Sequence, residues 1–430
     1  MLGLPAALLL LSSCSQSNDK PVSDFEASQA MVLTRGLPTL DTKNSIAIVE
    51  LDPESKNFGN IIQEMELSVE GRPFHHLYYS PAGRLYGTRL DEDCSLAEIT
   101  LTRDLSGKPK LERMQCIDTH GQAVGEDIMW ANSNGTQYMF VTFMGGTRLD
   151  KVDTGSVGVF DPNTNRLVKI IEARKSQIPE GAPYVEYPHG ITAYKDRLIV
   201  SSTAHPRIKG NIGNSITVID LNTLEPIENI VVESARPIGK PSAPVEMLFV
   251  RPEIAPNVKP FVLVNTELGY ETWQIPYDEK TKTFGKPTVV YDGESNNTGF
   301  PLEFYATDKE LFVTHAIPGV VKRYALNKLP KLIPSGPDLI TGNGAHHLVF
   351  FTSKSGKKYI AVQNNLVNRG NVKDNDPTDN DFFVKLNANT VTIHDFNSSD
   401  KVATIDFKKK YGLGVETIEG LFGPGYLHHH

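Results

Sequence analysis

The chain has 430 residues, of which 22% are charged, and its formal net charge is -8 with a pI near 5.9. Lysines and arginines are scattered rather than clustered, so the sequence lacks the basic surface that binds nucleic acid, and we expect no nucleic-acid partner. The chain is too long for one ordinary core, yet no Pro/Gly/Ser-rich linker divides it, which favours a repeat architecture.

The first residues, MLGLPAALLLLSSC, join a short apolar run to a lipobox-like tetrapeptide that ends at Cys14. The run is too short to cross a bilayer and fits the apolar core of a secretory signal. We expect residues 1–13 to be a lipoprotein-type signal peptide, Cys14 to be lipidated, and residues 14–29 to be a tether. The basic start of a signal is missing, and a buried N-terminal helix is the alternative. The protein would then lie in the bacterial cell envelope, periplasmic or at the outer membrane, and touch the membrane only through this lipid anchor.

The two other cysteines, Cys94 and Cys116, flank two strand-like runs, SLAEITL and KLERMQ. An exported protein can oxidise such a pair to a disulfide. In a symmetric hairpin centred near Leu105 the two cysteines face each other, close enough for a bridge.

The chain after the tether repeats one unit: a strand that opens after a Pro or Gly, a turn, a second strand, and a hairpin with an Asp/Asn turn, as in IVELDP, VGVFDPN and ITVIDLN. Inner-strand openings can be placed 43 to 70 residues apart, at His75, Glu126, His189, Glu246, Glu303, His346 and Glu416. Four strands at this spacing make one blade of a β-propeller. We predict an all-β fold: a single seven-bladed β-propeller domain over residues 30–430, in which N- and C-terminal strands share one blade and leave no free sheet edge.

The first residue of each opening would lie where the inner strands converge around the axis. Carboxylates gathered and buried there repel one another, and a cation would relieve that cost. Imidazoles are good ligands for copper, iron or zinc, and a carboxylate that accepts the second ring N–H aims the ring. The sequence therefore predicts a metal centre with three ligands, His75, His189 and His346. The expected catalytic residues, which orient these rings or move protons, are Glu126, Glu246, Glu303 and Glu416.

Further histidines are secondary candidates. His76 and His347 are expected to turn away from the axis, and His315, at the end of a second strand, could reach the same mouth. These three are the additional candidate ligands. Loops or the chain end are expected to hold five more: His120, His205, His428, His429 and His430. The alternative to a metal centre is a water-filled channel in which these polar residues only hydrogen-bond the strand ends.

The acidic stretch KDNDPTDND, from Lys373 to Asp381, is interpreted as a solvated insertion. It lacks the central Gly and terminal Glu of a calcium-binding EF-hand loop. No serine-hydrolase, nucleotide-phosphate or dinucleotide motif occurs in the sequence.

Four segments resemble the selenium-binding proteins, the family that includes methanethiol oxidases: SIAIVELDPESKNFGNIIQEMEL followed by HH, PYVEYPHGITAY, PVEMLFVRP and LFVTHAIPGVVKRYALN. The resemblance implies a seven-bladed propeller with copper-dependent oxidase activity that converts methanethiol to formaldehyde, hydrogen sulfide and hydrogen peroxide. The positions that match the family's motifs are His75, His76, His189 and Glu246. The family's cysteine-rich stretch after the HH pair is absent, since SPAGRLYGT stands there.

Together these features favour an exported metal-dependent oxidase or oxygenase of the selenium-binding protein type. Copper is the expected cofactor, and iron is the alternative, by analogy with propeller dioxygenases. The expected substrate is a small molecule, such as a sulfur compound, and dioxygen is the expected co-substrate. The alternative function is a non-catalytic metal- or partner-binding propeller lipoprotein. A calcium-dependent lactonase is disfavoured because calcium prefers oxygen ligands.

Overall fold

The computed structural model describes residues 29–36, 44–67, 73–91, 93–145, 155–172, 187–204, 212–234, 241–256, 258–342, 344–364, 389–421 and 427–428. Within these ranges the fold is all-β apart from the short helix α2 (Phe407–Tyr411) and one 3-10 turn (Leu326–Lys328). None of the helices in this part of the chain could cross a membrane. The predicted signal peptide, Cys14, the tether up to residue 28, the acidic stretch and His205 lie outside the described residues.

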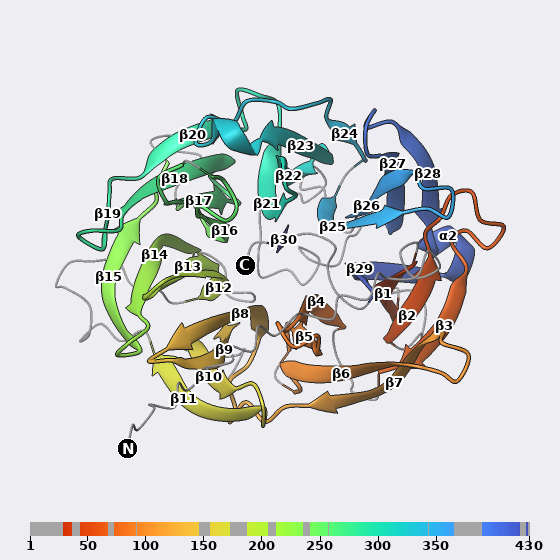
Figure 1. Ribbon diagram of the computed structural model, residues 1–430, viewed down its shortest axis with the longest axis horizontal. Coiled ribbons are helices and arrows are strands. Elements are labelled where there is room, and N and C mark those ends of the chain that lie inside the picture. Colours follow the sequence, from red (N-terminus) through yellow and green to blue (C-terminus); the bar gives the residue numbers. More distant parts are fainter. Residues whose placement is uncertain are drawn as a thin grey trace, which may run out of the picture.

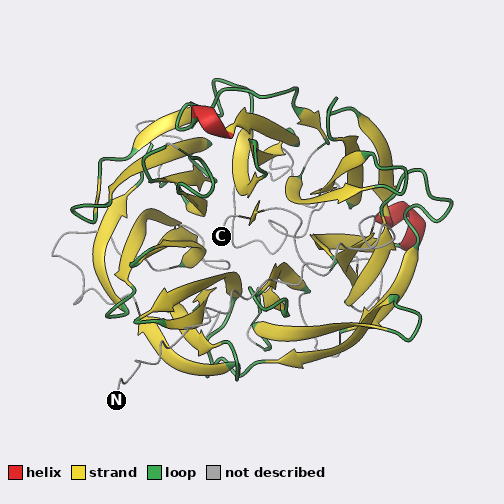
Figure 2. Ribbon diagram, in the orientation of Figure 1, coloured by secondary structure: helices red, strands yellow, loops and turns green. Residues whose placement is uncertain are grey.

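The described strands pair into seven antiparallel sheets arranged as blades around a central axis (Figures 1 and 2). Six of these sheets are built around consecutive strands of one stretch of chain. Their strands are β4 (Phe74–Tyr79), β5 (Leu85–Arg89), β6 (Leu96–Arg103) and β7 (Pro109–Cys116); β8 (Gly125–Ser133), β9 (Thr136–Phe143), β10 (Ser156–Asp161) and β11 (Arg166–Glu172); β12 (Pro188–Tyr194), β13 (Arg197–Ala204), β14 (Ile212–Asp220) and β15 (Glu225–Val231); β16 (Pro244–Val250), β17 (Phe261–Thr266), β18 (Glu271–Asp278), β19 (Thr283–Phe284) and β20 (Thr288–Asp292); β21 (Gly299–Ala306), β22 (Glu310–Ile317), β23 (Val320–Ala325) and β24 (Leu339–Ile340); and β25 (Ala345–Thr352), β26 (Lys358–Asn364), β27 (Thr390–Asp395) and β28 (Lys401–Asp406).

The remaining sheet is composite. Its inner strand is β29 (Leu413–Gly420), and its other strands come from the N-terminal part of the chain: β1 (Gln29–Gly36), β2 (Ser45–Glu50) and β3 (Ile61–Glu66). Because β29 has no hairpin after it, its open edge is covered by β1. A last short strand, β30 (Leu427–His428), pairs with the inner strand β21 near the centre of the ring (Figure 1).

The expected seven-bladed propeller is corrected to a six-bladed one. Six sheets are each built around one continuous stretch of chain and form the blades, whereas the remaining sheet combines strands from the two ends of the chain. The sheets are also not uniform, since two of them have five strands. The expectation that N- and C-terminal strands share one sheet is confirmed, because β29 pairs with β1.

The hydrophobic core lies between neighbouring blades. Strand β2 is buried along its whole length, whereas the outer strand β3 alternates between half-buried and exposed residues. One core cluster joins Val349 of β25 to Val49 of β2 and Val415 of β29, which both belong to the neighbouring composite sheet. Inner and middle strands are thus covered on both faces and read as nearly continuous apolar runs, and polar residues within them require another explanation.

Each inner strand contains a β-bulge at the level of the predicted axial residues. In β12 the register shifts between Pro188 and Ile191, so that His189 and Gly190 lie opposite the single residue Ser201. Counting all inner strands, the extra residue falls within the pairs 75–76, 126–127, 189–190, 245–246, 302–303, 346–347 and 415–416. A bulge holds two adjacent positions where we expected one axial position.

Polar side chains on the second strands tie each bulge to the next blade. Thr142 Oγ1 accepts a hydrogen bond from the backbone N–H of Asp127 at 2.9 Å and donates one to the carbonyl oxygen of His189 at 2.7 Å. On three other blades, the side chain at the position equivalent to Thr142 also donates a hydrogen bond to a backbone oxygen in the bulge of the next sheet. These bonds run from Ser201 to Val245, from Asn265 to Leu302 and from Gln363 to Glu416. These bonds satisfy backbone groups that the bulges remove from the ladder.

The structure bonds Cys94 to Cys116, with their Cα atoms 5.2 Å apart. The hairpin register expected for them is wrong, because Cys116 pairs with Ala97 and a bulge lies between Thr100 and Leu101. Cys94 instead lies in the turn before β6, where its φ of 58° is in the left-handed region.

The bridge closes a loop between residues 22 positions apart, which restricts the unfolded chain. We predict that replacing both Cys94 and Cys116 by Ser lowers the free energy of unfolding by about 3 kcal/mol, measured by denaturant unfolding. Reduced wild-type protein is the control and should match the variant. Equal stability of the variant and the oxidised wild type would contradict this expectation.

Candidate metal centre

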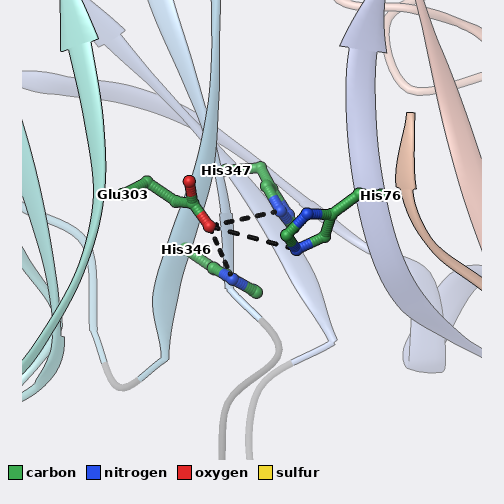
Figure 3. Close-up of side chains that lie close together, drawn as sticks. All are labelled: His76, Glu303, His346 and His347. Atoms are coloured by element: carbon green, nitrogen blue, oxygen red, sulfur yellow. Dashed lines mark ion pairs between the residues drawn. The ribbon is translucent and has the colours of Figure 1, made fainter. Parts of the chain in front are cut away.

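Four side chains from three inner strands meet in the channel: His76 from β4, Glu303 from β21, and His346 and His347 from β25. Their ligand atoms all lie within 4.8 Å of one another. Figure 3 shows the three imidazoles directed at one carboxylate oxygen, and Glu303 Oε1 lies 3.3 Å from His346 Nε2, 3.9 Å from His347 Nε2 and 4.0 Å from His76 Nε2. The cluster combines three imidazole nitrogens with one carboxylate.

The expectation that His76 and His347 turn away from the axis is wrong. Each is the second residue of its bulge and therefore equivalent to Glu303, which also takes the second position. Both are buried, with exposed fractions of 1% for His76 and 3% for His347. The predicted axial residues are first positions in some bulges, such as His346, and second positions in others, such as Glu303, because the repeat pattern assigns only one residue to each opening.

Burial keeps both of these rings neutral. It lowers the pKa of His76 to about 3, with His75 adding to the effect, and it lowers the pKa of His347 well below its ordinary value, with His346 adding to the effect. A neutral imidazole has one protonated and one unprotonated nitrogen, and only the unprotonated one can bind a metal. Which nitrogen is unprotonated therefore decides what this cluster can do.

The hydrogen bonds of His76 place its proton on Nδ1. Asp127 Oδ1 lies 3.0 Å from His76 Nδ1 and also accepts a hydrogen bond from the Tyr78 hydroxyl. The Tyr78 hydroxyl also lies 2.6 Å from Nδ1. Because this hydroxyl donates its proton to Asp127, both neighbours of Nδ1 can accept, so Nδ1 donates and Nε2 keeps its lone pair. Nε2 is buried and has no hydrogen-bond partner among the described residues.

The same arrangement holds for His347. Its Nδ1 lies 3.1 Å from Gln363 Oε1. The amide of Gln363 is oriented by its other end, where Nε2 donates to the carbonyl oxygens of Val415 and Glu416. Nδ1 of His347 thus donates to Gln363 Oε1, and its buried Nε2, which also lacks a hydrogen-bond partner in the described part of the chain, keeps its lone pair.

The cluster fits a transition-metal ion. Imidazole nitrogen and carboxylate oxygen bind such ions at about 2.0 to 2.2 Å, so ligand atoms around one ion lie at most roughly 4.4 Å apart. The observed limit of 4.8 Å is slightly wider, and the rings would have to move inward by only roughly half an ångström. The two buried lone pairs of His76 and His347 are what such an ion would satisfy.

The other predicted ligands do not join His346 around one point. His189 has Nδ1 at 3.0 Å from Glu246 Oε1 and Nε2 at 3.4 Å from Glu126 Oε1, and it belongs to a separate group with Asp127 and Glu246. His75 has its Nδ1 3.0 Å from Glu416 Oε1. The structure thus distributes the three expected ligands, His75, His189 and His346, over more than one His/carboxylate group of the channel.

The more exposed members of the channel mark its accessible side. Side-chain exposure is 13% for His75, 15% for His189 and 12% for Glu416, against 5% or less for His76, Glu303, His346 and His347. Glu126 lies deeper, between the rings of His75 and His189, and burial raises its pKa to about 8. This carboxyl group can therefore hold a proton at neutral pH.

His315 lies apart from the channel cluster. It is fully buried on β22, its ring contacts the ring of Tyr291 at 5.3 Å, and it belongs to none of the ligand groups among the described residues. His120, interpreted as a loop residue, lies in an exposed turn.

The sequence reasoning missed Tyr78, Asp127 and Gln363. In FHHLYY, Tyr78 is two residues after His76 and so on the same face of the strand, which was a usable signal. Gln363, a polar residue that follows the apolar strand segment before it in AVQNN, was a second usable signal.

Comparison with models of known families and with curated proteins gives no match. Among solved structures, a hypothetical selenium-binding protein from Sulfolobus tokodaii is similar at 15% identity, with 92% of this chain and 94% of that chain covered and a TM-score of 0.64. A putative 6-phosphogluconolactonase from Bacteroides uniformis is 14% identical, with 91% and 99% covered and a TM-score of 0.51. A functionally unknown protein from Desulfotomaculum acetoxidans is 11% identical, with 93% and 98% covered and a TM-score of 0.54. At these identities the likeness shows the propeller fold alone, and the resemblance to selenium-binding proteins holds as a distant structural similarity.

The burial of His315 predicts how the free energy of unfolding changes at acid pH. Neither of its ring nitrogens has a hydrogen-bond partner among the described residues, and burial lowers its pKa to about 3. In the unfolded chain a histidine titrates near 6.5, so His315 costs stability as the pH falls from about 6.5 toward 3. We expect His315→Leu to remove about 2 kcal/mol of the stability loss between pH 7 and pH 5, measured by denaturant unfolding at each pH.

Exposed His120 provides the matched control, and His120→Gln should leave the pH dependence as in the wild type. A His315→Leu variant whose stability falls with pH as steeply as that of the wild type would refute the prediction.

Proposed function

We propose that this protein is a metal-dependent oxidoreductase, an oxidase or oxygenase, that binds copper through His76, His346 and His347 with Glu303 as the fourth ligand. One observation carries the proposal: buried His76 and His347 have their protons on the far ring nitrogen and direct Nε2 at the same carboxylate oxygen. A channel that served only to hydrogen-bond strand ends would not leave two such nitrogens without partners.

The donor set favours copper over the alternatives. Imidazole suits copper, iron and zinc, while calcium and magnesium prefer oxygen ligands. The resemblance of the HH and PH segments to selenium-binding proteins supports copper, with iron as the alternative. The metal would supply one-electron chemistry with dioxygen when bound.

The protein's own groups have separate tasks in this proposal. Asp127 and Gln363 fix the tautomers of His76 and His347 and so aim their lone pairs. Burial of the cluster excludes water from it. Glu126, with a pKa raised to about 8, can exchange a proton with a substrate near His75 and His189.

The substrate proposed is a small molecule, such as a sulfur compound, that reaches the cluster past His75 and His189. These are the rings with appreciable exposure in the channel. The rings of His346 and His347 are stacked with centroids 3.8 Å apart, and His76 lies 4.9 Å from His347, so the cluster itself leaves little room for a large ligand.

The test is to measure bound copper and oxygen consumption in His76→Ala and His347→Ala. Each variant loses one of the proposed ligands, so both copper content and turnover should fall together. Gln363→Leu keeps the ligands but removes one acceptor for His347 Nδ1–H and leaves the Thr417 hydroxyl, which lies 3.1 Å from Nδ1; it should lower copper affinity by about 10-fold. His120→Ala is the matched control at an exposed histidine and should behave as the wild type.

Retention of a full equivalent of copper by both His76→Ala and His347→Ala would disprove this site. Copper binding without oxygen consumption on any thiol or other small substrate would instead favour the non-catalytic metal-binding alternative.

A further inference from the structure

The channel holds a second group of potential ligands with a different composition. Asp127 from β8, His189 from β12 and Glu246 from β16 come from three successive blades, and their ligand atoms lie within 4.8 Å of one another. We infer that these three residues form a second cation site, for a divalent ion such as Mn²⁺. This site is separate from the His76 cluster and does not depend on the proposed oxidoreductase function.

The backbone brings these three side chains together. Thr142 ties the two inner strands by accepting from the N–H of Asp127 and donating to the carbonyl oxygen of His189. Gly190 allows β12 to lie close against β16, because a Cβ at position 190 would overlap Val245 O and come within 3.1 Å of Glu246 Oε2. His189 Nδ1 therefore lies 3.0 Å from Glu246 Oε1, on strands that the fold holds close together.

A second observation points to a missing cation. Glu126 is only 2% exposed, its Oε2 has no hydrogen-bond partner among the described residues, and its Oε1 lies 3.4 Å from His189 Nε2. Three buried carboxyl groups, those of Glu126, Asp127 and Glu246, thus surround one imidazole. Glu126 can hold a proton at neutral pH, but the two ligand carboxyl groups, those of Asp127 and Glu246, would carry two negative charges when ionised, and a divalent ion would offset both.

The donors distinguish this site from the His76 cluster. One imidazole with carboxylates falls between calcium sites, which use oxygen alone, and copper sites, which use several imidazoles. Mn²⁺ and the similar Fe²⁺ and Zn²⁺ suit such a mixed set.

Asp127 connects the two sites, since one of its oxygens accepts from His76 Nδ1 at 3.0 Å. Its carboxylate would thus serve one ion directly and the other through the His76 ring.

The experiment uses the full chain, stripped with a chelator and titrated with Mn²⁺ while the electron paramagnetic resonance signal of free Mn²⁺ is followed. Copper is titrated in parallel. Glu246→Gln keeps the shape of the side chain but removes its charge, and it should weaken Mn²⁺ binding by about 10-fold or more while copper binding persists. His347→Ala should do the reverse. Glu419→Gln is the control, because Glu419 is also a buried glutamate on an inner strand and belongs to no ligand group among the described residues.

Thermal unfolding of each variant is recorded, and His189→Gln replaces Glu246→Gln if the latter does not fold. Saturable Mn²⁺ binding that Glu246→Gln weakens and Glu419→Gln does not establishes the site, even if copper fails to bind and the proposed function falls. Absence of saturable Mn²⁺ binding in the wild type overturns the inference. An unchanged Mn²⁺ affinity in Glu246→Gln also overturns it. If Glu246→Gln and His347→Ala each lose both metals, the channel has a single site, and the inference is overturned as well.

Discussion

In each inner strand two residues lie opposite one residue of the neighbouring strand, and the arrangement of the channel depends on this extra residue. A regular strand would direct alternate side chains to opposite faces of its blade, where neighbouring blades cover both. The bulge interrupts that alternation, so polar residues can occur in pairs, such as His346 and His347, without entering the apolar layers between blades. The backbone groups it releases are satisfied from second strands by residues such as Thr142 and Gln363. The same two side chains also donate to backbone oxygens of the next blade, which fixes the spacing of one bulge relative to the next.

The chemistry of the channel follows from burying imidazoles and carboxylates together. Burial disfavours charge on both, and it lowers the pKa of His76 to about 3 while raising that of Glu126 to about 8. Two kinds of neighbour result. Asp127 and Gln363 each accept a hydrogen bond from the Nδ1–H of one ring. That ring stays neutral, and the lone pair of its Nε2 is directed into the cluster, where it can bind a metal. Where carboxylates face both ring nitrogens, as Glu126 and Glu246 do around His189, the group is rich in oxygen donors. One channel thus offers ligand groups of different composition: among the described residues, His76, Glu303, His346 and His347 form one group, His75, His76 and Glu126 a second, and Asp127, His189 and Glu246 a third.

The sequence identified the inner-strand openings and most of the titratable residues in the channel, because the repeat places them at recurring positions. It could not decide between adjacent residues, since spacing alone does not reveal a bulge. His76 and His347 were therefore assigned to the wrong side, and His189 was grouped with His346. Asp127 and Gln363 were missed because their roles depend on contacts across strands and blades. The bridge between Cys94 and Cys116 was expected from a register three residues away from the observed one, in which Ala97 pairs with Cys116. The composite sheet was predicted, because the repeat leaves the last inner strand without a hairpin and the first strands without an inner strand of their own.

The most direct measurement of the central claim is the position of copper in crystals of the copper-loaded protein, located by anomalous scattering at the copper absorption edge. The account predicts an anomalous peak in the channel at about 2.0 to 2.1 Å from Nε2 of His76, His346 and His347. A peak on His75 and His189 instead, or none in the channel of a copper-soaked crystal, would contradict it.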